Sequence, residues 1–558
     1  MAEIITTLFK TDLARNFYSD TQANEYYVFA SAISAAYNDR TDAENTLRSK
    51  NLFLDKLIYG KKILPTDVKF MVKYNPWQVG GTFDRYDDNV DIESDKFWCV
   101  VGPQLNDTGD YRVYKCLDNN NGGTVSTQPN FLATMQDQIY RTADGYVWKY
   151  MFKLTQPEFE AYNASGYIPI AGYEFPINLF EEHPQNANTV TVLPTTTGSP
   201  IDQIFVTNAE ANAGYPKASG LIAALPGNDQ TITLQRGVDY PLNEITNYYN
   251  GMTLSIVSAA GVTSLYDVVG YTFNTTTQIG TVTITAGQVF DSDIEIGNAY
   301  EILPTVKITG DGTGAEAKAI VDDGIVTDVL VIAPGSGYKT VTTSVVDPAY
   351  DFDPEDALST DIRATVRSIL SPPAGHNVNP VEELQCRHIL MYGYITETDN
   401  LQIGATNDYS HVGIVKNPEW ANTSSDYTPP SIFDNRIAII TDDYQKAIVD
   451  DTLSQVDVNN DVIFEAMVHE VDTTANTVYL YDYNRTFQNQ ANSTIALDYT
   501  RDLQTSAGQI IQINSPAADN VTESPYTQSS GHVYFIEDFA PIVRTVQSRE
   551  EYKLVVEF

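Results

Sequence analysis

Basic residues, cysteines and long apolar runs are all scarce in this sequence of 558 residues. Lysine and arginine number 33 against 73 aspartates and glutamates, which gives a net charge of −40. A nucleic-acid site and a site for an anionic membrane both need a basic surface, so neither partner is expected. The acidic excess fits a highly soluble protein or one that meets basic partner surfaces.

Only three cysteines are present, Cys99, Cys116 and Cys386. Because they are odd in number and widely spaced, they exclude a disulfide framework and a zinc site. KFWCVV and YRVYKCL, which hold the first two, both read as strands, so we expect buried thiols. Cysteine used in this way is typical of a chain made in a reducing cytoplasm.

No window approaches 18 consecutive apolar residues, so no membrane-spanning helix is expected. The first 20 residues, MAEIITTLFKTDLARNFYSD, lack the continuous apolar region of a signal peptide. We therefore expect a soluble protein that is not exported by a standard signal.

Motifs of catalysis are also missing. No two of the six histidines are three or four positions apart, and there is no Gly-x-Ser-x-Gly elbow. The sequence therefore predicts no enzyme, with no catalytic residue, no cofactor and no metal site. The histidines are His183, His376, His388, His411, His469 and His532.

Three acidic clusters could offer oxygen ligands to calcium, at residues 83–95, 347–356 and 457–461. An EF-hand loop needs glycine at its sixth position, where the loop that starts at Asp457 has Val462. None of the clusters is assigned as a calcium site. Paired carboxylates for glycoside cleavage cannot be distinguished within this acidic background.

Glycines at 310, 312 and 314 resemble a phosphate-binding loop at first sight. In a dinucleotide fingerprint, the third glycine would come one residue later and a helix would follow. Here AEAKAIV runs into Asp-Asp-Gly and then IVTDVLVI, which indicates a hairpin with an Asp-Gly turn. We expect these glycines to form turns and bulges, not a nucleotide site.

The first 60 residues are the most helical in pattern. Apolar residues at three- and four-residue spacings predict helices over 23–39 and 43–62, the second capped by Thr41 or Asp42. YYVFASAIS, within the first of these, could equally be a strand. From about residue 64, short aromatic and β-branched runs alternate with Gly, Asn, Asp and Pro, as expected of β domains.

The fold class predicted is mainly β (β-rich α+β), with several irregular sandwich- or barrel-like domains and a partly helical N-terminal segment. Trp148, Tyr150, Tyr534 and Phe535 alternate along strands and are expected in cores. Shifts in composition divide the chain at about residues 185, 304, 375, 420 and 525, and the segments 186–304, 305–375 and 421–525 are expected to be β modules.

Three stretches resemble a known family. DYRVYKCLDNN with RTADGYVWKYMFKL forms one signature, and NPVEELQCRHILMYGYI through HVGIVKNPEW forms the second. The third is the C-terminal GHVYFIEDFAPIVRTVQSREEYKLVVEF. They resemble the baseplate wedge subunit encoded by gene eight of T-even-like contractile-tailed phages. The resemblance covers 1–185, 376–420 and 526–558, so the chain looks like a member enlarged by inserted β modules.

The resemblance implies a structural virion protein, made in the host cytoplasm, that forms a homodimer and contacts other wedge subunits of the tail baseplate. No chemistry and no small-molecule substrate are implied. The alternative is a carbohydrate-binding tail fibre or spike, with or without depolymerase activity. Thr/Gly/Asn-rich β modules and the surplus of carboxylates and tyrosines would suit that role.

Overall fold

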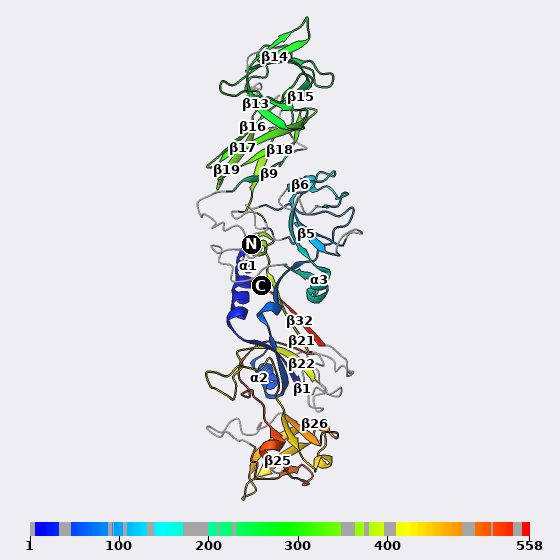
Figure 1. Cartoon of the computed structure of the whole chain (residues 1–558), viewed down its shortest axis with the longest axis vertical. Helices are drawn as coiled ribbons and strands as arrows, with labels where there is room; N and C mark the ends of the chain where they lie inside the picture. The colour runs from blue at the N-terminus through cyan, green and yellow to red at the C-terminus, as the bar shows by residue number, and fades with distance from the viewer. Residues whose placement is uncertain are drawn as a thin grey trace. The chain divides into compact units, whose positions relative to one another are not determined.

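The computed structural model describes residues 6–32, 46–87, 92, 94–103, 109–130, 139–170, 199–209, 212–225, 230–346, 363–372, 376, 379–395, 409–481, 497–514, 517–538 and 550–558. It is mostly β structure, as predicted (Figure 1). The chain divides into two compact units. Unit 1 holds Met1–Phe9, Lys73–Phe159 and Ile170–Cys386, and unit 2 holds Lys10–Val72, Glu160–Pro169 and Arg387–Phe558.

Helices are few in the described residues, and none is long and apolar enough to span a membrane. The α-helices are α1 (Thr7–Ala23), α2 (Leu47–Asp55), α3 (Gln156–Tyr162), α4 (Pro380–Glu383) and α5 (Ala517–Asn520). The short 3-10 helices include η1 (Pro65–Asp67), η2 (Asn120–Gly122) and η6 (Tyr444–Lys446).

Of the two helical ranges predicted near the N-terminus, 23–39 contains a strand, the alternative left open for YYVFASAIS, and 43–62 is only partly helical. Tyr26–Ala32 is strand β1 and Leu57–Ile63 is strand β2, so only α2 lies within the predicted helical ranges. β1 pairs with a neighbour on each side, and Tyr26 to Ala30 are all buried. A strand covered on both faces loses its alternation, and a short apolar run of this kind also fits a helix.

The cap predicted for the second helix lies outside the described residues, which do not include Thr41 and Asp42. The helix begins instead at Leu47, and the Thr46 Oγ1 accepts a hydrogen bond from the Ser49 amide at 3.2 Å. This side chain satisfies one of the free amides in the first turn.

Unit 1 contains a four-stranded antiparallel sheet in the order β4-β5-β7-β6. Its strands are β4 (Trp98–Val101), β5 (Tyr111–Asp118), β7 (Val147–Leu154) and β6 (Ile139–Arg141). Cys99, Cys116 and Trp148 are fully buried in its core. All three cysteines of the chain are buried thiols, which confirms the prediction made for Cys99 and Cys116 from their strand context.

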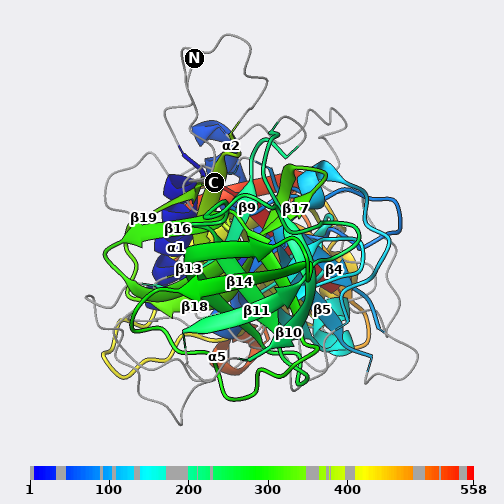
Figure 2. The same ribbon diagram turned by 90° about the horizontal axis from the view of Figure 1, so that it is seen from above.

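A closed six-stranded barrel follows in unit 1, with the order β10-β11-β14-β13-β12-β15. Figure 2 shows β13, β14, β11 and β10 side by side. Every buried residue of the barrel's apolar core falls between Ala218 and Ile302, so the barrel has a core of its own. Its strands are β10 (Ala218–Ala224), β11 (Thr231–Gln235), β12 (Thr253–Val257), β13 (Thr263–Asn274), β14 (Ile279–Ile284) and β15 (Ala299–Leu303).

A second six-stranded sheet of unit 1 has the order β19-β16-β17-β18-β9-β20. The Ser368 Oγ donates to the Thr343 Oγ1 at 3.0 Å and so links the two edge strands of this curled sheet. Its strand β9 precedes the barrel in sequence. The strands are β9 (Ile201–Val206), β16 (Thr305–Gly310), β17 (Thr313–Asp322), β18 (Ile325–Ser336), β19 (Val341–Val346) and β20 (Val366–Leu370).

The glycine-rich stretch forms the predicted hairpin. β17 and β18 are antiparallel, and Asp323 and Gly324 connect them with φ values of 45° and 78°. A Cβ on Gly312 would lie 2.4 Å from the Tyr338 ring, so glycine is required there by a close approach. No helix follows these glycines, and the stretch lacks the geometry of a dinucleotide site.

Unit 2 contains three sheets, ordered β23-β2-β1-β22-β31, β32-β21-β3-β8 and β29-β28-β25-β26-β27-β24-β30. The strands not yet given are β3 (Val68–Lys73), β8 (Tyr167–Pro169), β21 (His388–Ile395), β22 (Tyr409–Lys416), β23 (Ile432–Asp434), β24 (Ile437–Ile440), β25 (Thr452–Val456), β26 (Val462–Asp472), β27 (Thr477–Tyr481), β28 (Leu503–Thr505), β29 (Ile510–Ile511), β30 (Val521–Thr522), β31 (His532–Asp538) and β32 (Glu550–Glu557).

Of the aromatic residues predicted in cores, Trp148 and Tyr150 are buried, whereas Tyr534 is 39% exposed. Phe535 is half-buried. Ile414 pairs with Phe535 and Val415 pairs with Val533, so Tyr534 is the extra residue of a β-bulge. A bulge disrupts the alternation of faces, which is why the prediction for Tyr534 was wrong.

Candidate functional site

A cluster of charged side chains in unit 1 lies where its four-stranded sheet meets the curled sheet. We call it the ionic junction. Three ion pairs form it: Lys115 with Glu383 at 2.9 Å, Arg367 with Asp87 at 2.8 Å and Arg141 with Asp328 at 2.9 Å. His376 also contacts Asp202 at 2.6 Å.

The centre of the ionic junction is almost fully buried. The Lys115 side chain has no exposed surface, and that of Glu383 is 4% exposed. The Lys115 Nζ also lies 4.0 Å from the centre of the Tyr86 ring. The His376 Nδ1 is 3.5 Å from the Glu383 carboxylate, so both ring nitrogens of His376 face acids.

Burial and charge compete at this centre. Burial alone would lower the pKa of Lys115, but the charge of Glu383 outweighs it and the pKa is raised. Burial alone would raise the pKa of Glu383, but Lys115 and His376 lower it below the usual range. The pair is therefore charged at neutral pH, which is the condition for a stable buried ion pair.

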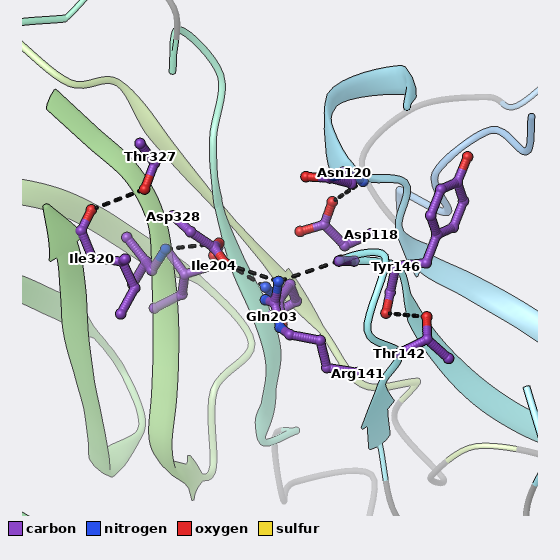
Figure 3. A network of polar contacts seen from close by, with 12 residues as sticks. Asp118, Asn120, Arg141, Thr142, Tyr146, Gln203, Ile204, Ile320, Thr327 and Asp328 are labelled. Carbon is purple, nitrogen blue, oxygen red and sulfur yellow. Dashed lines mark hydrogen bonds and ion pairs between the residues drawn. The ribbon is translucent and has the colours of Figure 1, made fainter. Parts of the chain in front are cut away.

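Figure 3 shows the outer part of the ionic junction around Arg141, which extends from β6 towards Asp328 on β18. The Asp328 Oδ1 accepts from the Val329 amide at 2.8 Å. On the other side, the Asp118 Oδ1 accepts from the Asn120 amide at 3.0 Å. Burial raises the pKa of both carboxyls, and the charge of Arg141 partly offsets the shift.

A cation–π contact completes the ionic junction. The Arg85 guanidinium carbon lies 3.4 Å from the centre of the Phe205 ring on β9. Burial lowers the pKa of Arg85. A planar guanidinium stacked on an aromatic face fixes orientation as well as distance, so this contact adds to the alignment of the two sheets.

Ser371, Asp202 and His376 supply the residue types of a hydrolase triad, but not its arrangement. The Ser371 hydroxyl donates to Asp202, and no contact joins it to His376 in the described part of the chain. A nucleophilic serine needs the histidine as its base. All three side chains are also buried. The arrangement therefore joins segments of the chain and is not set up for acyl transfer.

The other histidines are dispersed. The rings of His388 on β21 and Tyr167 have centres 4.2 Å apart and are tilted by 37°. The His469 Nδ1 on β26 lies 3.2 Å from the Arg436 Nη1. His411 is in β22 and His532 is in β31, whereas His183 lies outside the described residues. Within the described ranges, no three His, Cys, Asp or Glu side chains are grouped so that they could hold a metal.

The acidic clusters have different surroundings. Asp87, from the first, pairs with Arg367 in the ionic junction. The Asp457 Oδ1 accepts from the amides of Asn459 at 2.7 Å and Asp461 at 2.9 Å, so it closes its own turn. The cluster at 347–356 lies outside the described residues.

The ionic junction was not identified from the sequence. One signal was available, because Lys115 is a charged residue inside YRVYKCL, a stretch that was predicted to be a strand with a buried cysteine, and it is buried there. A lysine in the interior of a buried strand needs a carboxylate partner. Its partner Glu383 lies 268 positions later, too far for any spacing rule to find.

A comparison with models of known protein families gives no match for this chain. A search of curated proteins likewise returns no significantly similar relative. The function is therefore inferred from the residues of the chain itself.

Proposed function

We propose that this chain is a structural component of the baseplate wedge of a contractile-tailed bacteriophage. It is made in the host cytoplasm, is incorporated into the tail baseplate, and contacts other wedge subunits and a second copy of itself. It takes part in baseplate assembly and in triggering sheath contraction. It carries out no chemistry.

The observation that supports the proposal most strongly is that the stretches resembling the wedge-protein family pair with one another as β-strands. β21, from the second signature, pairs with β32, from the third, along its whole length from His388 with Glu557 to Ile395 with Glu550. β22 and β31 also pair, from His411 with Asp538 to Lys416 with His532, with a bulge between. The two strands of the first signature, β5 and β7, are also neighbours. Segments remote in sequence thus form common sheets.

The ranges outside the resemblance form separate sheets. The barrel and the curled sheet draw all their strands from residues 186–375. The seven-stranded sheet of unit 2 draws its strands from 421–525. Among the described strands, only the edge strand β23 joins a sheet of the resembling ranges from outside them. This pattern is expected of a wedge protein enlarged by insertions.

The ionic junction is consistent with a structural role. Buried ion pairs add little net stability compared with apolar packing, but a misaligned pair leaves charge buried, so they can favour one arrangement. The pair of Arg141 on β6 with Asp328 on β18 joins the four-stranded sheet to the curled sheet, and so favours one orientation of the two. Arg367 on β20 pairs with Asp87, in the segment before β4, and adds to this alignment. A component of a large assembly needs that fixed geometry.

Electron microscopy of gold-labelled particles tests the proposal. Particles from the natural source are labelled with an antibody against this chain, with particles treated with pre-immune serum as the control. We expect label in a ring at the distal end of the tail. Label along projecting fibres would support the carbohydrate-binding alternative, and unlabelled particles would contradict a virion role.

A further inference from the structure

The barrel of unit 1 has two distinct ends. The chain enters at Ala218 and leaves at Leu303, which lie at one end because Ala218 pairs with Ile302. The opposite end, the free end, carries the connections 258–262 and 285–298, the end of β10 and the start of β11. Val257 pairs with both Thr263 and Ala299, which places these two connections next to each other.

The connection 285–298 closes the free end. β14 and β15 are separated in the barrel by two strands in either direction, so the segment that joins them must cross the opening. Ile294 of this segment is 4% exposed and packs into the barrel core. The Asp291 amide donates to the Tyr266 hydroxyl at 3.0 Å. These two contacts hold the crossing segment against the barrel, and its other side faces outwards.

That outer face exposes aliphatic side chains. Val289 is 56% exposed and Ile296 is 65% exposed, both on the crossing segment. Val262, on the adjacent hairpin, is 55% exposed, and Leu225, directly after β10, is also exposed. Single exposed aliphatics are common, but a group of four at one end of a small barrel indicates a contact surface.

The charge around these side chains has one sign. Asp291, Asp293 and Glu295 are all exposed on the crossing segment. The range 218–303 contains one basic residue, Arg236, at the other end of the barrel, where it pairs with Glu244 at 2.8 Å. The acids at the free end are not balanced by any lysine or arginine of the barrel itself.

We propose that the free end of the barrel binds a protein surface with lysine or arginine side chains around an apolar centre. Complementary charge steers such a contact and excludes wrong partners. A second copy would oppose acid with acid, and an anionic membrane would be repelled. The inference rests on the proposed function for where this partner is sought, among the proteins that assemble with this chain.

Zero-length carbodiimide cross-linking tests the inference, because the reagent joins carboxylates to lysines in direct contact. The lysate in which the chain is naturally made is cross-linked, separated into particle and soluble fractions, and analysed by mass spectrometry. We expect Asp291, Asp293 or Glu295 to be linked to lysines of another protein. Asp239, exposed at the attached end, is the internal control and should give no such links.

Two variants of the full chain sharpen the test. The first variant should reduce the yield of these links about tenfold, and it combines Val262→Ser, Val289→Ser and Ile296→Ser. Val238→Ser with Ile245→Ser changes exposed aliphatics at the attached end and should leave the yield unchanged. Links in the soluble fraction alone would contradict the proposed function but not this inference. A chain that is present without links from the free end, in either fraction, overturns the inference.

Discussion

At the scale of residues, Lys115 is a position where a buried charge depends on its partner. Its ammonium is fully buried, and removal of one partner of a buried ion pair leaves a charge without compensation. The stability of unit 1 should therefore depend on Glu383 more than on any exposed acid. Surface ion pairs, by contrast, contribute at most about 1 kcal/mol.

We expect Glu383→Gln to destabilise unit 1 by about 3 to 5 kcal/mol. Lys115→Met removes the buried charge itself, so the double variant should recover part of that loss. Urea unfolding followed by tryptophan fluorescence measures the effect, since Trp77, Trp98 and Trp148 all belong to unit 1. Lys446→Met, which breaks an exposed pair with Asp443, is the control. Equal losses in the single and double variants would contradict the coupling.

The effect of Glu383 should also depend on pH. Its pKa is lowered in the folded chain, so its stabilisation is present above the usual value of 4.5 and is lost as the pH falls through the lower folded value. The difference in stability between wild type and Glu383→Gln should be complete at neutral pH and shrink below pH 4.5. A difference that stays constant down to the acid transition would exclude this role for the carboxylate.

At this scale, the sequence predicted whether a residue lies in a buried strand or in a turn. Cys99 and Cys116 were assigned to buried strands from their neighbours alone, and the glycines from 310 to 314 were assigned to a turn region. The ionic junction was missed because its pairs join residues that are remote in sequence, and ion pairing has no periodicity to detect. Tyr534 was assigned to a core because a bulge cannot be seen in one strand alone.

At the scale of elements, the hairpin of β17 and β18 depends on close contact between glycines and backbone. Gly335 has φ of 64°, and a Cβ there would lie 2.6 Å from the Ala315 amide nitrogen. Gly314, in the paired strand, has φ of 78° but open space, with its nearest neighbour at 3.9 Å. Both positions have a positive φ, but only at Gly335 would an added Cβ clash with backbone atoms.

Alanine substitutions separate these two costs. Gly314→Ala should destabilise the hairpin by about 1 to 2 kcal/mol through its positive φ alone. Gly335→Ala should cost about 1 to 3 kcal/mol more, because backbone atoms must move. Hydrogen exchange of the β17 and β18 amides in the full chain measures both effects. Equal effects would mean that the strands separate freely at this point.

The type of each element was predictable where one face was buried and the other was exposed. The β13 strand of the barrel alternates in this way, and its range was read correctly as β structure. The range of β2 was assigned to a helix. The range of β1 was left open between helix and strand because both of its faces are covered and its apolar residues form a continuous run. The pairing partner that decides the matter, β22, lies hundreds of residues later in the chain.

At the scale of the whole molecule, the barrel is built as a separable insertion. Its entry and exit strands are paired neighbours, and its core is self-contained. We expect that replacing residues 218–302 with a short Gly–Ser linker leaves the curled sheet folded, as judged by protection of its amides from exchange. Deletion of 231–302, which keeps β10 without its neighbours, is the control and should aggregate. Loss of protection in both would show that the barrel supports the sheet.

The proposed homodimer is also testable at this scale. Light scattering after size-exclusion chromatography should give twice the chain mass of 61.8 kDa. The barrel-deleted chain should still dimerise, since the proposed dimer belongs to the resembling ranges. A monomer at all concentrations would exclude self-association as part of the function.

The pairing of β1 with β22, and of β22 with β31, also has a consequence for how the protein is made. Synthesis proceeds from the N-terminus, and domains fold as units while the chain grows. The barrel has all its strands within one continuous segment and can close early. The five-stranded sheet of unit 2 must wait for its last strands, because β1 acquires its second neighbour only when residues 409–416 of β22 have been made, and β22 then waits for β31.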